Sequence, residues 1–261
     1  MTIHTSNSPS LSVLFCTNVW NTFCDRALSS IELQTFVDFE IIIVANCIDN
    51  LDFERLKIRA TDSRVRVFKT SVSGVTFSRN LALHHCRAPL IAVMDADDIS
   101  YPCRFAIQVE FFRLHPEVMV CGSNFDVIDA QDNKLKTCYL PKSNLEIRNS
   151  LVWRNPLCHP TIMLRTVCLR NVGGYGASNS NAEDYDLWVR MAEDADLHFA
   201  NVSDSLLGYR IPVVSVARRS RRAYAFTSSV QFRTFVLKKQ PLWLLASILT
   251  FFKLLFYANR Q

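Results

Sequence analysis

Short, almost uninterrupted apolar runs recur along the first hundred residues. They are LSVLFCT (11–17), FEIIIVAN (39–46), RVRVFKT (64–70) and PLIAVM (89–94). Strands that are apolar on both faces are typical of parallel sheets covered by helices. Apolar residues at helical spacing lie between them, in segments 22–34 and 75–86. The alternation predicts an α/β fold with a mostly parallel central sheet.

The pattern changes after residue 100. Two antiparallel strands joined by the turn AQDN are expected in VMVCGSNFDVID and KLKTCYL. The remaining expected elements are helices at 103–114 and 143–152, a strand at 158–165, a flexible Gly/Ser/Asn-rich loop at 173–182 that could close over a ligand, a helix from about Asp184, and a strand within SLLGYRIPVVSVA (205–217). The second half is therefore expected to differ in organisation from the first.

Composition narrows the class of protein. At 261 residues, with 49% hydrophobic and 20% charged residues, the chain is expected to form one large domain with a short appendage. A net charge of +5 gives no case for nucleic acid as a partner. The nine cysteines are scattered without a C-x-x-C pair, which argues against a disulfide scaffold or zinc module and fits a reducing cytoplasm. The N-terminus has no Lys or Arg before LSVLF, so a secretory signal is not expected there.

Three carboxylates follow the last of the apolar runs, in IAVMDADDIS (91–100). One interpretation is a solvated turn or helix cap, which Asp98 in particular would suit. The other is a hard-cation site at the carboxyl end of a parallel strand, where ligands bind in such sheets. Asp95 and Asp97 alternate, and their oxygens suit Mg²⁺ or Mn²⁺ bridging to substrate phosphates.

Several segments, in order and spacing, resemble the family 2 glycosyltransferases, which are inverting enzymes with the GT-A fold. The matching text is SVLF, SSIELQTFVDFEIIIVAN, GVTFSRNLAL, IAVMDADDIS and NAEDYDLWVRM, covering about residues 11–210. Within the family the chain looks most like bacterial enzymes that build O-antigen or other surface polysaccharides. The resemblance implies a Rossmann-like nucleotide-diphospho-sugar domain over residues 1–215.

The resemblance also assigns the donor site. Asp97 would hold Mn²⁺ or Mg²⁺ with Asp95 as second ligand or ribose contact, and Arg79 would lie beside the nucleotide. Further donor contacts are implied at Thr17 and Ala96. Many members carry two acids and Gly-Ser after the second strand, where this chain has Ala45-Asn46-Cys47, and Cys16 and Asn18-Val19 depart from the first-strand pattern. Asn46 would still accept a hydrogen bond from uracil, so UDP is favoured over dTDP or GDP.

The motif NAEDYDLWVRM supplies the expected catalytic acids. Helix N-terminal acids favoured by the dipole are one explanation. By resemblance, Asp184 is the general base and Glu183 precedes it. An acceptor or sugar pocket is implied for His159, Trp188 and Arg190, although a core position for His159 is equally open.

The segment 216–261 lies outside the resemblance. ARRSRRAY is basic, and PLWLLASILTFFKLLFY (241–257) is shorter than the ~20 residues of a spanning helix. A core helix packed on the domain is one interpretation. An amphipathic, membrane-associating helical tail on the inner face of the bacterial plasma membrane is the favoured one.

Together these features predict a metal-dependent, cytoplasmic, peripheral membrane hexosyltransferase. It would move a hexose, glucose or galactose first among them, from a UDP-sugar to a sugar on a polyprenyl-diphosphate lipid, forming a β-linkage in O-antigen or related biosynthesis. The alternatives are a nucleotidyltransferase, or a catalytically impaired nucleotide-binding membrane scaffold.

Overall fold

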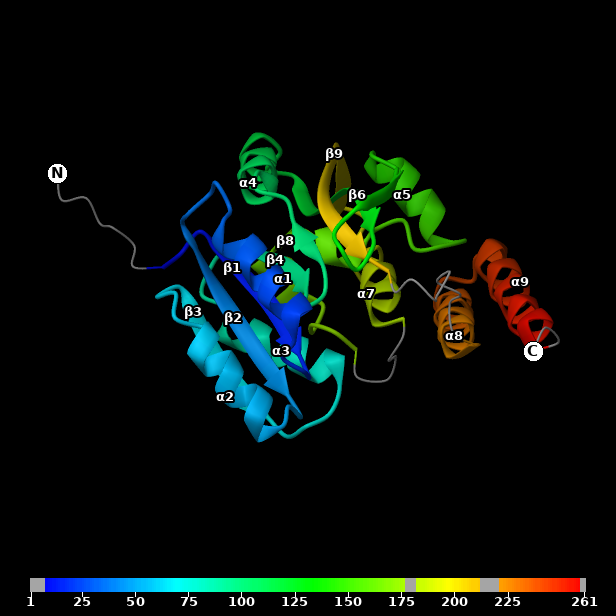
Figure 1. The fold of residues 1–261 in the computed structure, drawn as a ribbon. Helices are drawn as coiled ribbons and strands as arrows, with labels where there is room; N and C mark the ends of the chain where they lie inside the picture. The colour runs from blue at the N-terminus through cyan, green and yellow to red at the C-terminus, as the bar shows by residue number, and fades with distance from the viewer. Residues whose placement is uncertain (1–7, 177–181, 212–220, 259–261) are drawn as a thin grey trace.

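The computed structural model describes residues 8–176, 182–211 and 221–258. Within these ranges nine strands form one sheet in the order β3-β2-β1-β4-β8-β6-β9-β5, with β7 beside β6 (Figure 1). The strands are β1 (Leu11–Thr17), β2 (Phe39–Asn46), β3 (Val65–Thr70), β4 (Leu90–Asp95), β5 (Ile99–Ser100), β6 (Val118–Ile128), β7 (Lys134–Cys138), β8 (Met163–Arg165) and β9 (His198–Arg210). The helices are α1 (Thr22–Glu32), α2 (Asn50–Arg59), α3 (Val75–His85), α4 (Arg104–Leu114), α5 (Asn144–Leu151), the 3₁₀ turn η1 (His159–Thr161), α6 (Thr166–Asn171), α7 (Glu183–Met191), α8 (Arg221–Lys238) and α9 (Pro241–Ala258).

The first four long strands are parallel, as the apolar runs predict. Every residue of β2 is buried, because helices cover both faces of the sheet. Ile41 and Ile43 pack in a core with α1 and α4, whereas Ile42 and Val44 face a second core shared with α3 and α7. This is the α/β arrangement that the resemblance implies, with the carboxyl ends of β1, β2 and β4 at one edge.

The remaining strands form a mixed sheet. β8 is antiparallel to β4 and to β6, whereas β9 runs parallel to β6. The predicted strand at 158–165 is shorter than expected, because Pro160 lies in η1 and the ladder starts only at Met163. The strand expected within 205–217 already begins at His198 and extends to Arg210. Residues 212–217 lie outside the described ranges, as do 177–181 of the expected loop.

The two C-terminal helices form a hairpin, and α8 lies against α7 (Figure 1). Gln231 donates to the Val152 carbonyl at 2.9 Å, and Arg233 pairs with Asp186 of α7 at 2.7 Å. Within the hairpin, Ser228 and Ser247 hydrogen-bond to each other. One face of the hairpin is therefore an integral packing surface of the domain.

The opposite face of the hairpin is apolar and exposed. The small residues Ala246 and Thr250 of α9 are buried. The outward residues are 43–56% exposed, namely Leu242, Leu245, Ile248, Leu249, Phe251 and Phe252. None of the helices in the described part of the chain combines the length and hydropathy needed to span a bilayer.

Candidate functional site

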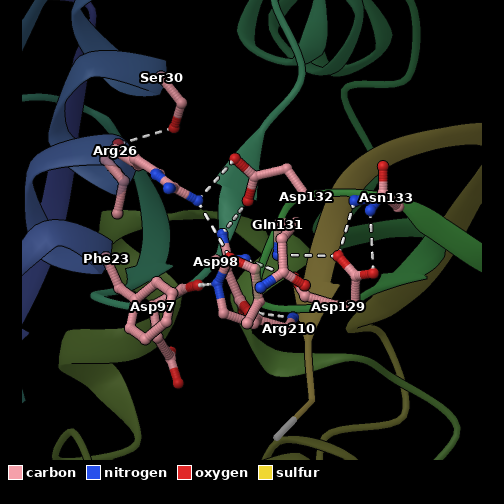
Figure 2. A network of polar contacts seen from close by, with 12 residues as sticks. Phe23, Arg26, Ser30, Asp97, Asp98, Asp129, Gln131, Asp132, Asn133 and Arg210 are labelled. Atoms are coloured by element: carbon pink, nitrogen blue, oxygen red, sulfur yellow. Dashed lines mark hydrogen bonds and ion pairs between the residues drawn. The ribbon is translucent and has the colours of Figure 1, made fainter. Parts of the chain in front are cut away.

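The turn after β4 is anchored to β9. Asp98 is fully buried, and its Oδ1 accepts the backbone N–H of Arg210 at 2.8 Å (Figure 2). Burial and the neighbouring charges of Asp95 and Asp97 raise the pKa of Asp98 well above its usual range. Asp98 thus ties the turn to another strand instead of capping the segment that follows it.

Asp97 lies at the exposed tip of this turn, after Ala96. No side chain of the described residues pairs with its carboxylate. Although Asp97 is exposed at the surface, the protein around it takes away part of its hydration, and this loss together with repulsion from Asp95 raises the pKa of Asp97. A cation would relieve this unfavourable pair of charges. In the described ranges no three His, Cys, Asp or Glu side chains converge into a metal cage. The donor set fits Mg²⁺ or Mn²⁺, which take one or two carboxylates and complete their shell with waters and substrate phosphates.

Arg79 connects the two halves of the site. Its buried guanidinium donates to Asp95 at 3.1 Å and to Glu183, at the start of α7, at 3.0 Å. The guanidinium carbon also lies 5.4 Å from the centre of the Tyr175 ring. Burial alone would lower the pKa of Arg79, but Asp95, Tyr175 and Glu183 together raise it, so the side chain stays charged. Arg79 thereby fixes α7 relative to the end of β4.

A cavity of about 450 Å³ brings the strand-end acid and the α7 acids together. Asp184 lines the cavity, and Asp184 Oδ2 accepts a hydrogen bond from Asn155 at 2.7 Å. The full lining is Arg79, Asp95, Phe125, Leu140, Asn155, Leu157, Cys158, His159, Pro160, Glu183, Asp184 and Tyr209. A half-buried carboxylate in such a cavity is a candidate for accepting a proton from a hydroxyl group bound there.

His159, Trp188 and Arg190 lie in different surroundings. His159 lines the cavity and bonds through Nε2 to the Tyr175 hydroxyl at 3.0 Å, and burial lowers its pKa well below the usual value, so the ring is neutral. Trp188 is fully buried in the core. Arg190 binds Asp186 at 2.9 Å and the carbonyls of the loop after α6. Neither Trp188 nor Arg190 is part of the cavity wall.

A second cavity, of about 330 Å³, lies at the ends of β1 and β2. It is lined by Cys16, Thr17, Asn18, Asn46, Cys47, Ser73, Gly74, Val75 and Ser78. Asn46 donates through Nδ2 to the Gly74 carbonyl at 3.0 Å and to Ser78 Oγ at 2.6 Å. Gly74 has a φ of 132°, which other residues rarely adopt, and it starts α3 at this point. Because both N–H groups of Asn46 are engaged, its buried Oδ1 is left to accept a hydrogen bond and has no partner among the described residues.

Sequence reasoning missed several residues of the larger cavity. Asn155 stands in the segment NPLCHPTIMLR and could have been proposed with His159. Phe125 and Tyr209, whose ring centres are 5.6 Å apart, come from β6 and β9, and no local motif marks either one. Arg210 does not line this cavity, and no local sequence motif marks it either, because the residues that it binds are distant in sequence.

Comparison with known proteins identifies the family. A protein-family model described as "Glycosyl transferase family 2" matches residues 13–170, which is more than half of the chain. The O-antigen biosynthesis glycosyltransferase WbnJ of Escherichia coli is 31% identical over 232 residues, covering 88% of this chain and 90% of that relative. The amylovoran biosynthesis glycosyltransferase AmsE of Erwinia amylovora is 30% identical over 191 residues, covering 71% of this chain and 70% of that relative.

Two solved structures share the fold at low sequence identity. S. aureus TarS 1–349 in complex with UDP-GlcNAc has a TM-score of 0.67 at 16% identity, with 87% of this chain and 66% of that chain covered. The mannosyltransferase PcManGT of Pyrobaculum calidifontis, in complex with GDP-Man and Mn²⁺, has a TM-score of 0.66 at 15% identity, with 88% and 65% covered.

Proposed function

Because the chain belongs to glycosyl transferase family 2 and is a glycosyltransferase, we propose that it transfers a hexose from a UDP-sugar to a sugar on a polyprenyl-diphosphate lipid with inversion at the anomeric carbon. The observation that carries the proposal is that one cavity is lined by both Asp95, at the end of β4, and Asp184, at the start of α7. The similarity to WbnJ and AmsE supports a role in O-antigen or a related surface polysaccharide.

The smaller cavity supports uridine as the base. The free Oδ1 of Asn46 is an acceptor for the N3–H of uracil, and Thr17 lies in the same wall. A protein with this fold binds UDP-GlcNAc and another binds GDP-Man, so the fold alone does not select the base. The choice of UDP therefore rests on Asn46. Among hexoses, glucose and galactose are the first donors to test.

The acids divide the chemistry between them. The acceptor hydroxyl oxygen forms a bond to C1 of the sugar, its proton passes to Asp184, and the bond from C1 to the diphosphate oxygen breaks with UDP as leaving group. Glu183 is paired with Arg79 at 3.0 Å and holds the end of α7 in place. A Mn²⁺ or Mg²⁺ ion held by Asp97, with Asp95 beside it, would supply positive charge to the leaving diphosphate.

The exposed face of α9 supports a membrane location for the acceptor. Its outward apolar residues form one stripe, with Lys253 exposed nearby and Arg221 and Arg222 exposed at the start of α8. Apolar stripes flanked by basic residues bind anionic bilayers in the interface plane. A polyprenyl-linked acceptor would be presented at such a surface, which we propose to be the inner face of the bacterial plasma membrane.

The decisive experiment is a panel of nucleotide sugars incubated with the full-length protein, Mn²⁺ and a lipid-diphosphate sugar acceptor, followed by linkage analysis of the product. UDP-glucose or UDP-galactose should give a β-linked product. Transfer only from GDP- or dTDP-sugars would overturn the choice of UDP. A product with retained configuration would overturn the proposed single displacement.

A further inference from the structure

Arg210, the last residue of β9, has no role in the chemistry described above, yet its side chain is bound on several sides. Only 7% of the residue is exposed, and the guanidinium carbon lies 4.7 Å from the centre of the Phe23 ring. Figure 2 shows the side chain between the Asp97–Asp98 turn and the turn that joins β6 to β7. A buried arginine that is held on several sides fixes the position of whatever it binds.

Two of its hydrogen bonds hold the acidic turn. Nε donates to the backbone carbonyl of Asp97 at 2.7 Å, and the backbone N–H of Arg210 donates to Asp98 Oδ1 at 2.8 Å. Both bonds leave the carboxylate of Asp97 untouched. Arg210 therefore fixes the backbone of the proposed metal ligand without competing for its oxygens.

The other contacts anchor Arg210 to the turn that joins β6 to β7, which serves as its support. Nη1 donates to the Asp129 carbonyl at 2.6 Å, and Nη2 pairs with the Asp132 carboxylate. Within this turn, Asp129 Oδ1 accepts the backbone N–H groups of Gln131 at 2.8 Å and Asn133 at 2.9 Å. The turn is thus braced by its own side chains.

A third element reaches the same support. Arg26 of α1 pairs with Asp132 at 3.2 Å and donates to the Ala130 carbonyl at 3.1 Å. Asp132 therefore binds two arginines, Arg26 of α1 and Arg210 of β9. The acidic turn, the β6–β7 turn and α1 meet at one guanidinium.

We infer that Arg210 is a positioning residue that preorganises Asp97 to receive the divalent cation together with the donor diphosphate. The inference rests on the proposed function and deepens it. Partners that orient metal ligands typically change metal affinity 10–100-fold when they are removed. Lysine at position 210 would keep the charge but could not bind Asp97, Asp129 and Asp132 at the same time, because an ammonium lacks the planar fork of a guanidinium.

The test compares Arg210→Lys with a matched control. Arg165 makes the same kind of contacts, to the carbonyls of Val118, Phe112 and Pro116, but none of them lies in the acidic turn. Arg165→Lys therefore removes equivalent structural bonds elsewhere. Binding of Mn²⁺ to the full-length proteins in the presence of UDP is measured from the EPR signal of the free ion, and the melting temperature is recorded in parallel.

Arg210→Lys should weaken UDP-dependent Mn²⁺ binding by about tenfold, whereas Arg165→Lys should leave it unchanged even if both lower the melting temperature. Equal Mn²⁺ binding by Arg210→Lys and wild type, or equal weakening in both variants, would overturn the inference. If Arg210→Lys does not fold, Asp132→Asn loosens Arg210 from its support and should weaken Mn²⁺ binding in the same direction; unchanged binding would count against the inference. A wild-type protein that takes up no Mn²⁺ with UDP would instead refute the metal part of the proposed function itself, and the inference with it.

Discussion

The two halves of the sheet place their functional groups by different means. In the parallel half, Asn46 and Asp95 each stand at the end of an apolar strand, so the strand itself delivers them to the site. In the mixed half, Asp184 stands at the start of α7 and depends on Asn155, a residue from a different segment, for its orientation. The donor side is thus organised by the periodicity of local sequence, and the proposed acceptor side by contacts between distant segments.

The contrast has a functional consequence. If the parallel half binds the donor and the mixed half serves the acceptor, substitutions in the two halves should have separable effects. Changes at Asp184 and its contacts in the mixed half should lower turnover without weakening UDP binding, whereas changes in the parallel half should alter donor or metal binding. Arg210 lies in the mixed half, but it binds the acidic turn and is therefore expected to act with the donor side. The four predictions below test this separation, from the largest expected effect on transfer to the smallest.

Asp184→Asn keeps the shape of the side chain and its contact with Asn155 but cannot accept a proton. Turnover should fall about 10²–10⁴-fold, the usual cost of losing a general base. UDP affinity, measured by calorimetry, should be unchanged because the cavity that we propose for the nucleotide lies at β1 and β2. Asp204→Asn, at an exposed position of β9, is the control and should behave as wild type. Normal turnover of Asp184→Asn together with an inactive Glu183→Gln would show that the two acids have exchanged roles.

Asp97→Ala should lower transfer by about 10²–10³-fold, the typical cost of losing one electrostatic contact to charge that develops in the transition state. The protein should keep its circular dichroism spectrum, since Asp97 is exposed and makes no side-chain pair in the described ranges. Excess EDTA should abolish wild-type transfer, and added Mn²⁺ should restore it. Full activity in EDTA would eliminate the metal from the mechanism.

Asn46 can be tested with an altered ligand, which avoids confusion with folding. N3-methyl-UDP lacks the donor that we assign to Asn46 Oδ1, so wild type should bind it about tenfold more weakly than UDP, since an unpaired buried acceptor costs about 1–3 kcal/mol. In Asn46→Ala the two ligands should bind nearly equally. Equal binding of both by wild type would show that Asn46 does not read the base.

Substitutions on the exposed face of the hairpin are expected to have the smallest effect on transfer. Replacing Leu245, Ile248 and Phe252 by serine should reduce co-sedimentation with anionic liposomes, because their exposed apolar area is what the bilayer would bury. Transfer to a short water-soluble acceptor should be unaffected. The matched control replaces three exposed apolar residues of the parallel half, Leu33, Leu51 and Ile58, which are 74%, 63% and 77% exposed. If both triple variants lost co-sedimentation to the same extent, the hairpin would not be the specific membrane contact.

The same contrast explains what the sequence could predict. The strands β1, β2 and β4 are apolar along their length, and each was predicted within one residue of its observed bounds. The sequence pattern does not predict helix α2, because Asp52 and Leu56 are its only buried residues and it therefore has no apolar periodicity. Local pattern specifies an element only where that element buries a continuous face.

Long-range contacts account for what local pattern missed in the candidate site. The bond from Arg79 to Glu183 joins residues 104 positions apart, and the bond from Arg210 to Asp98 joins residues 112 positions apart. Resemblance to a family brought Arg79 and Glu183 into view, because both stand in recognisable motifs. Arg210 stands outside those motifs, and only the folded chain shows what it holds.

The ion pair between Asp186 and Arg233 ties the hairpin to α7. It joins α8 to the helix that begins with the proposed base, and Trp243 of α9 is buried in the core that also contains Trp188 of α7. If the outer face of α9 rests on a bilayer, the base is held at a fixed height above the lipid headgroups. Such a protein would select acceptors by length, because it would glycosylate only carrier-linked chains whose terminal hydroxyl lies at the height of the base. In a chain extended by a further sugar, the terminal hydroxyl would lie beyond the base.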